Sequence, residues 1–97
     1  MMIHSKKDAI KAVRALESEG TDHEEINCIT WVETEGVMNN FTHTEIRKDA
    51  EGNLFIFSFG KNWVDQGRSY ISEKRAIEMV YKNRKLINKY QKLDYKY

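Results

Sequence analysis

The sequence predicts a small α+β domain in the order helix, three strands, helix. Two stretches near the ends of the chain, 6–19 and 72–97, have apolar residues three and four positions apart, the spacing of an amphipathic helix. Between them lie three short runs rich in β-branched and aromatic residues, separated by turn-forming residues. A chain of 97 residues has room for one core, and a helix layer on a sheet buries both kinds of element. We therefore expect residues 1–97 to form one domain, with a three-stranded antiparallel meander packed by the N- and C-terminal helices.

The first helix is predicted from a capping signal at its start, an apolar stripe along its length and a glycine beyond its end. Ser5 and Asp8 have the spacing of a capping box, in which each side chain accepts from a backbone amide of the other residue. Gly20 is a typical residue just beyond a helix C-terminus. The apolar stripe between them consists of Ala9, Ile10, Val13 and Leu16.

The three strands are predicted at 26–33, 41–48 and 54–59. Between the last two, residues 49–53 form the clearest turn signal in the chain, with Gly52 suited to a positive φ. Along the third strand, Leu54, Ile56 and Ser58 alternate with Phe55, Phe57 and Phe59, so the two sets face opposite sides of the sheet. Two helices on one side leave the other set without cover, which favours self-association or a binding partner.

The last stretch, 72–97, is predicted as one helix that begins after Ser72. Twenty-six helical residues would be about 39 Å long, more than a three-stranded sheet can cover. We therefore expect the core to use the helix up to about Ile87, and residues 88–97 to protrude from the domain.

Charge is distributed unequally along the chain, although the net charge is only +1. The first 60 residues hold six cations and eleven carboxylates, a net charge of −5, whereas the last 37 hold ten cations and four carboxylates, a net charge of +6. Such asymmetry describes surface potential and partners rather than the fold. It indicates either a basic face for an anionic partner, or complementary ends that pair within a monomer or a homodimer.

Several classes of protein are disfavoured. No apolar run approaches the roughly 20 residues of a membrane span, and the N-terminal residues lack the apolar segment of a signal peptide, so we expect a cytoplasmic protein without a membrane partner. A single cysteine, Cys28, excludes an intramolecular disulfide and is expected to be a small core residue. Neither a metal site nor a cofactor is expected, because paired Cys and His spacing and phosphate-binding glycine motifs are missing.

One row of polar residues is a candidate site for acid–base or phosphate chemistry. His43, Glu45 and Arg47 alternate along the second predicted strand and so share one face. They can serve acid–base or phosphate chemistry, or they can pair across strands as a structural feature. We favour pairing, because the sequence places no activated nucleophile or second carboxylate beside them.

The main candidate site is the basic, tyrosine-rich end of the last helix. Lysine ammonium groups approach phosphates or carboxylates, while arginine and tyrosine side chains hydrogen-bond or stack, a mixture suited to an anionic macromolecule. The competing interpretation is a solvated helix face whose cations favour the helix C-terminus. The residues are Lys82, Arg84, Lys85, Lys89, Tyr90, Lys92, Tyr95 and Tyr97.

The sequence thus predicts a small non-enzymatic binding protein, a regulator or inhibitor that contacts a macromolecular partner through this basic helix and the adjoining sheet. Its lack of proline and its many Lys, Asn and Tyr residues are typical of phage and mobile-element accessory proteins. The alternative is an RNA- or DNA-binding protein that uses the same helix, although a net charge of +1 disfavours a dedicated nucleic-acid binder. A small hydrolase or nuclease built on His43, Glu45 and Arg47 is the third hypothesis. No catalytic residue is assigned.

Overall fold

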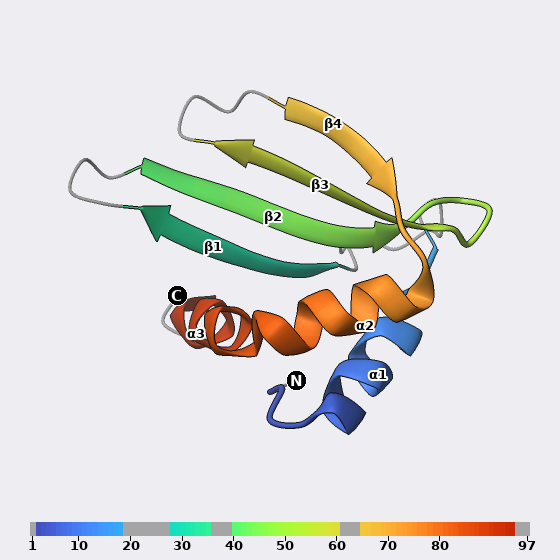
Figure 1. Cartoon of the computed structure of the whole chain (residues 1–97), viewed down its shortest axis with the longest axis horizontal. Coiled ribbons are helices and arrows are strands. Elements are labelled where there is room, and N and C mark those ends of the chain that lie inside the picture. The colour runs from blue at the N-terminus through green and yellow to red at the C-terminus, as the bar shows by residue number, and fades with distance from the viewer. Residues whose placement is uncertain (1, 19–27, 36–39, 61–64, 95–97) are drawn as a thin grey trace.

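A computed structural model describes residues 2–18, 28–35, 40–60 and 65–94 (Figure 1). This part of the chain forms three helices and one four-stranded antiparallel sheet. In chain order the elements are α1 (Lys6–Arg14), β1 (Ile29–Glu35), β2 (Asn40–Lys48), β3 (Leu54–Gly60), β4 (Asp65–Tyr70), α2 (Glu73–Lys82) and α3 (Arg84–Asp94). The strands lie in sequence order, β1-β2-β3-β4, so the sheet is a simple meander.

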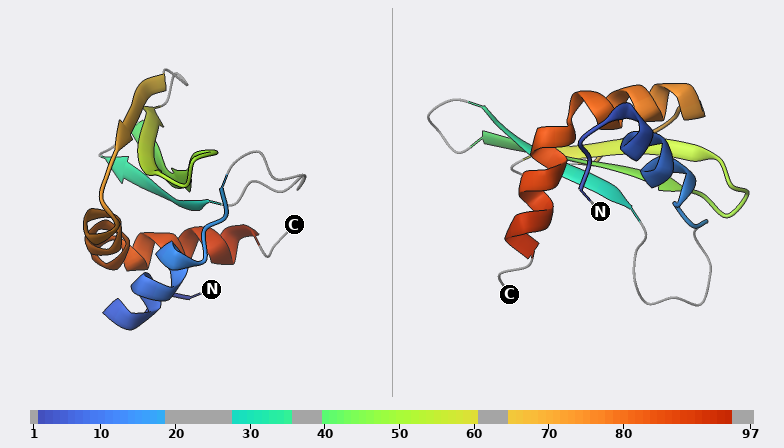
Figure 2. Two further views of the ribbon diagram at one scale, coloured as in Figure 1. Left: turned by 90° about the vertical axis from the view of Figure 1, so that its right-hand side faces the viewer. Right: turned by 90° about the horizontal axis from the view of Figure 1, so that it is seen from below.

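A row of isoleucines across the sheet forms the apolar surface on which the helices pack. The strand registers place Ile29 beside Ile46 and Ile46 beside Ile56, all on one face. Ile46 is fully buried and the other two pack in the same cluster. The residues that complete this core are Ile3, Ala9, Val13, Leu16, Trp31, Leu54, Ala76, Ile77, Val80 and Ile87. Helix α2 runs along the strands, α1 packs beside it, and α3 turns across the end of α2 (Figures 1 and 2).

Helix α3 also crosses the β1 edge of the sheet. Its residue Ile87 is buried in the core cluster, and most of its contacts with the sheet are to β1. Tyr90, one turn further on, contacts His43 with the ring centroids 5.7 Å apart. His43 alternates with the core-facing Thr44 and Ile46, so its side chain lies on the opposite face. The helix therefore reaches around the edge strand to the far side of the sheet.

The predicted α+β class is confirmed, but the expected three-stranded sheet is wrong, because Asp65–Tyr70 forms a fourth strand. This strand is polar and lacks an alternating apolar pattern, and its register shifts where Phe57 and Phe59 of β3 meet it. Gly67 adopts a positive φ of 83° within it. Pairing with β3, rather than local preference, makes this segment a strand.

The expectation of a single C-terminal helix is also wrong, because the helix is interrupted at Asn83, between α2 and α3. Asn83 has φ −101° and ψ 17°, and its backbone N–H and its side-chain Nδ2 both donate to Met79 O, at 3.0 and 2.9 Å. Its own carbonyl accepts from Ile87 N at 3.0 Å and so begins α3. An asparagine side chain that bonds to the backbone competes with the helix ladder, which explains the break.

The first helix starts as predicted and ends early. Ser5 and Asp8 form the full capping box. The helix ends at Arg14 instead of residue 19, and Ser18 instead makes an isolated parallel bridge to Lys48. Leu16, in between, stays buried at 6% exposure. Contact with the sheet therefore overrides the helical periodicity, while the predicted stop at residue 20 and the start of the strand predicted at 26–33 lie outside the described residues.

Asn88 joins the two ends of the chain. Its Nδ2 donates to Ile3 O and its Oδ1 accepts from Ile3 N, both at 2.8 Å, while Ile3 itself is 1% exposed. Asn88 is the first residue of the segment expected to protrude, and here it is half-buried. The protrusion of the last residues stays a prediction, since 95–97 lie outside the described part of the chain.

The predicted turn between β2 and β3 is confirmed. Asp49 N donates to Asn53 O at 2.9 Å, and Gly52, with φ 86°, donates to Asp49 O at 3.0 Å. The carboxylate of Asp49 accepts from Asn53 N at 2.8 Å and from Glu51 N at 3.0 Å. These backbone bonds, with a smaller contribution from the Tyr70 hydroxyl, hold the pKa of Asp49 below its ordinary value, although burial opposes them.

Replacing Asp49 by alanine should lower the thermal midpoint at neutral pH, because the turn amides lose their acceptor. A lowered pKa means that ionised Asp49 stabilises the fold above the unfolded-state pKa of about 3.9 and that this contribution is lost as the pH falls through the folded-state pKa. The difference in Tm between wild type and Asp49→Ala, followed by circular dichroism, should therefore shrink towards pH 3. Glu51→Ala, in the same turn, is the matched control, and a difference that does not change with pH would contradict the assignment.

Replacing Asn88 by alanine should destabilise the protein by about 1–3 kcal/mol, because it leaves the backbone groups of the buried Ile3 without their side-chain partners. The measurement is the free energy of unfolding from urea denaturation. Lys89→Ala removes an exposed side chain from the same helix and should change this free energy by less than about 0.5 kcal/mol. Equal effects of the two substitutions would show that the Ile3 contact contributes nothing.

Candidate functional site

The structure divides the predicted basic site. Lys85 and Lys89 are exposed and, four residues apart on α3, share one face. Arg84 turns back towards α2, where its Nη1 donates to Tyr81 O at 3.0 Å and its Cζ lies 4.5 Å from the centre of the Tyr81 ring. Tyr90 points to the sheet, as its contact with His43 shows. Lys82 is exposed at the end of α2, whereas the side chain of Lys92 and residues Tyr95 and Tyr97 lie outside the described part.

The polar row on β2 is brought together as the alternation indicated. Glu45 Oε1 lies 3.3 Å from His43 Nε2, and Glu45 Oε2 lies 2.5 Å from Arg47 Nη2. Thr30 Oγ1 donates to Thr44 O at 3.0 Å and lies 2.6 Å from His43 Nε2. Because the single hydroxyl proton of Thr30 is used on Thr44 O, His43 must donate from Nε2.

These contacts support structural pairing over acid–base chemistry. Glu45 is 9% exposed and both of its oxygens are held by neighbouring side chains, so neither is directed at a substrate. The bonds from β2 to Thr30 tie the edge strand β1 to its neighbour. Nearby, burial raises the pKa of the Cys28 thiol, the negative charge of Glu45 raises it further, and Arg47 opposes the rise.

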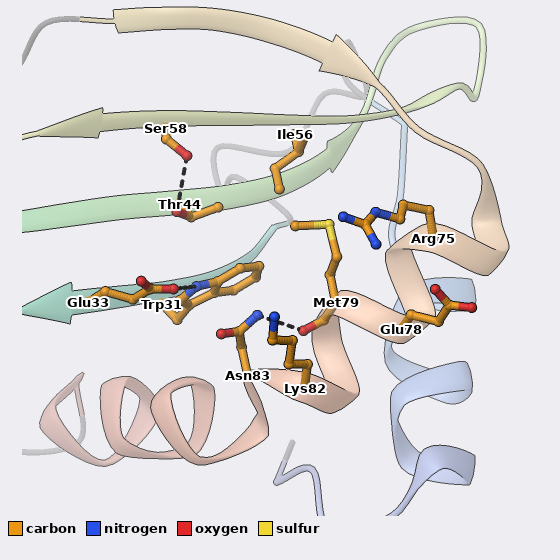
Figure 3. A pocket seen from close by; sticks show the side chains of 10 residues that line it. All are labelled: Trp31, Glu33, Thr44, Ile56, Ser58, Arg75, Glu78, Met79, Lys82 and Asn83. Atoms are coloured by element: carbon orange, nitrogen blue, oxygen red, sulfur yellow. Dashed lines mark hydrogen bonds between the residues drawn. The ribbon is translucent and has the colours of Figure 1, made fainter.

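A groove between α2 and the sheet was not predicted (Figure 3). It has a volume of about 510 Å³. Its wall is a stripe on α2 formed by Arg75, Met79 and Lys82, which are four and three residues apart and so share a face. The remaining lining residues are Trp31, Glu33, Thr44, Ile56, Ser58, Glu78 and Asn83.

The groove exists because the apolar row of the sheet stops there. Two residues before Ile46 on β2, the core-facing position is Thr44, and its cross-strand partner on β3 is Ser58. Their hydroxyl oxygens lie 3.1 Å apart. Two bonded hydroxyl groups offer a helix little apolar surface to cover. Helix α2 ends beside this site, and α3 turns away beneath β1 (Figures 2 and 3).

The wall of the groove is cationic and its floor is partly apolar. The ends of Arg75 and Lys82 lie on either side of Met79, and Glu78 points away from it (Figure 3). Within the described residues, neither of these cations forms an ion pair. Glu33, at the far end of the groove, accepts from Trp31 Nε1 at 3.4 Å. The arrangement suits an elongated ligand that carries negative charge beside an apolar group.

One signal for the groove was present in the sequence. Ser58 continues the alternation of Leu54 and Ile56, so a polar residue stands at a position that the pattern assigns to the core face. Its partner Thr44 is equally polar, but only the strand register shows that the two meet.

Comparison of the chain with protein-family models, curated proteins and solved structures found no match. Among the described residues, no helix is long and apolar enough to cross a membrane. The same part of the chain contains no group of three or more His, Cys, Asp and Glu side chains that could hold a metal ion.

The raised pKa of Cys28 predicts slow reaction with thiol reagents. Less of this thiol is ionised at neutral pH than in an exposed cysteine, so the midpoint of the rate–pH profile should lie above about 8.5. Glu45→Gln should lower this midpoint, because it removes a nearby negative charge. The profile is measured with Ellman's reagent on the folded protein, and a midpoint at or below that of an unstructured cysteine peptide would contradict the assignment.

Proposed function

We propose that this protein is a small non-enzymatic regulator that acts by binding another protein, and that an acidic, extended segment of the partner lies in the groove beside α2. The observation that carries the proposal is the Arg75–Met79–Lys82 stripe, in which two cations flank an apolar side chain and face the floor of the groove. The exposed lysines of α3 lie beyond the end of this stripe and extend the positive surface.

Charge around the groove supports an acidic partner. The exposed cations of the two C-terminal helices outnumber their carboxylates, and Glu73 already pairs with Arg14 of α1 at 3.0 Å. Opposite charge speeds association and selects among partners, even where it adds little affinity. The exposed cations are Lys74, Arg75, Lys82, Lys85 and Lys89.

The geometry of the stripe specifies the spacing of the partner's residues. Seven helical residues from Arg75 to Lys82 rise about 10 Å along α2. A peptide in the extended polyproline II conformation rises about 3.1 Å per residue and has three residues per turn, so residues three positions apart lie about 9 Å apart on the same face. We therefore infer two acidic residues three positions apart, with an apolar residue between them that contacts the half-buried Ile56 and Met79.

A protein partner fits the groove better than a nucleic acid does. The half-buried Ile56 and Met79 offer apolar contact, and the carboxylate of Glu33 at one end disfavours a continuous phosphate backbone. Nucleic-acid binding through Lys85 and Lys89, and self-association into a homodimer, are the alternatives that the experiment must separate.

The test is capture of partners from lysate of the cell that encodes the protein, with and without nuclease treatment. The tagged protein is compared with Arg75→Glu/Lys82→Glu, and with Lys7→Glu/Lys11→Glu, which makes the same charge change on exposed positions of α1. The reversed stripe should repel an acidic segment, so captured protein should fall at least tenfold with the groove variant and less than twofold with the α1 variant.

Three results would overturn the proposal. They are capture that disappears with nuclease treatment, equal loss in both double variants, and the absence of any captured protein. Sedimentation of the purified protein tests the homodimer. If the wild type is a dimer and the groove variant is a monomer, a second copy of the chain occupies the groove.

A further inference from the structure

A second surface lies on the opposite face of the sheet, over β2, β3 and β4. Phe55 and Phe57 alternate with the core residues of β3 and so point away from the helices, where their rings stack with centroids 6.1 Å apart. Arginines cover them: Arg68 Cζ lies 4.1 Å from the centre of the Phe55 ring, and Arg47 Cζ lies 5.1 Å from that of Phe57. Phe55 is fully buried as a result, although it is not part of the core cluster that the helices cover.

The outer layer of this surface consists of two exposed side chains with planar groups, Arg68 and Tyr70. Arg68 is exposed while it stacks on Phe55, and Tyr70 is 59% exposed while its ring meets Phe55 edge-on at 6.1 Å. The Tyr70 hydroxyl also contributes to the lowered pKa of the Asp49 carboxyl. Both side chains therefore pack against the Phe55 ring, and each has an exposed side that a ligand can contact.

We propose that Arg68 and Tyr70, supported by Arg47 and Phe57, bind single-stranded nucleic acid by stacking on unpaired bases. Every base has a π face, and proteins use both aromatic rings and guanidinium planes as stacking partners. The two side chains are two residues apart on one strand, about 7 Å along it, which allows successive splayed bases to take one platform each. A duplex hides these base faces, so the surface selects single strands.

The charges on this face favour phosphate. The carboxylate of Glu45 is bound to Arg47 and His43, and that of Asp49 is bound within its turn. Within the described residues Arg68 forms no ion pair, so its charge is available to a phosphate beside the stacked base. One or two such contacts predict a shallow salt dependence, with a slope of about −1.

This surface is independent of the proposed protein-binding groove, which lies on the helix-covered face. A protein segment is the competing occupant, since arginine and tyrosine are also enriched at protein interfaces. Nucleic-acid binding here neither requires nor excludes the groove, and the lysines of α3 provide an internal comparison.

The experiment measures the fluorescence anisotropy of labelled oligo(dT), oligo(dA) and oligo(U) of about 10 nucleotides, with a duplex of equal length for comparison, between about 50 and 200 mM salt. We expect saturable binding of single strands and at least fivefold weaker binding of the duplex. Arg68→Lys keeps the charge but removes the stacking plane and should weaken binding at least fivefold. Tyr70→Ala should do the same, whereas Tyr70→Phe should bind within twofold of wild type.

Lys85→Gln/Lys89→Gln is the control, and it should change the affinity less than twofold. Near-UV circular dichroism shows that each variant is folded, and an unfolded Tyr70→Ala leaves Arg68→Lys to decide. The proposal is overturned if no oligonucleotide binds, if Arg68→Lys binds as wild type does, or if the α3 control abolishes binding. The last outcome would assign nucleic acid to the basic helix instead.

Discussion

The antiparallel register that aligns Ile29, Ile46 and Ile56 is the constraint on which the structure depends. Side chains alternate between the faces of a sheet, so a shift of one residue in any strand would move its apolar set away from the helices. The same register decides where the helix layer ends, because the next core-facing pair is Thr44 and Ser58. The groove beside α2 is thus a consequence of core packing.

The helix interruption at Asn83 and the hydrogen bonds between Asn88 and Ile3 determine where the C-terminal residues lie. A straight helix would carry the chain along α2 and away from the sheet, whereas the turn sends α3 across the β1 edge. Asn88 then holds Ile3, 85 residues away in the chain, and Tyr90 reaches His43 on the far face. Arg84 bends back onto α2, so a site that looks continuous in sequence is divided in space.

The two faces of the sheet differ in how their charged side chains are paired. On the far face the buried carboxylate of Glu45 contacts the side chains of His43 and Arg47, and the guanidinium groups of Arg47 and Arg68 lie over phenylalanine rings. On the helix side the cations of α2 flank a groove without ion pairs among the described residues. The same residue types therefore underlie the two kinds of recognition that we propose: stacking on an exposed surface, and pairing with an elongated acidic segment in a groove.

Local patterns determined the capping box at Ser5, the turn at 49–53, the alternation along β3 and the shared face of the β2 polar row, because each depends on neighbours within a few residues. The tertiary structure decided the fourth strand, the break at Asn83 and the early end of α1. It also decided both candidate surfaces, since Ser58 meets Thr44 and Arg68 meets Phe55 only through strand pairing. Contacts between distant residues outweigh local propensity where the propensity is weak, and such contacts leave no periodic trace in the sequence.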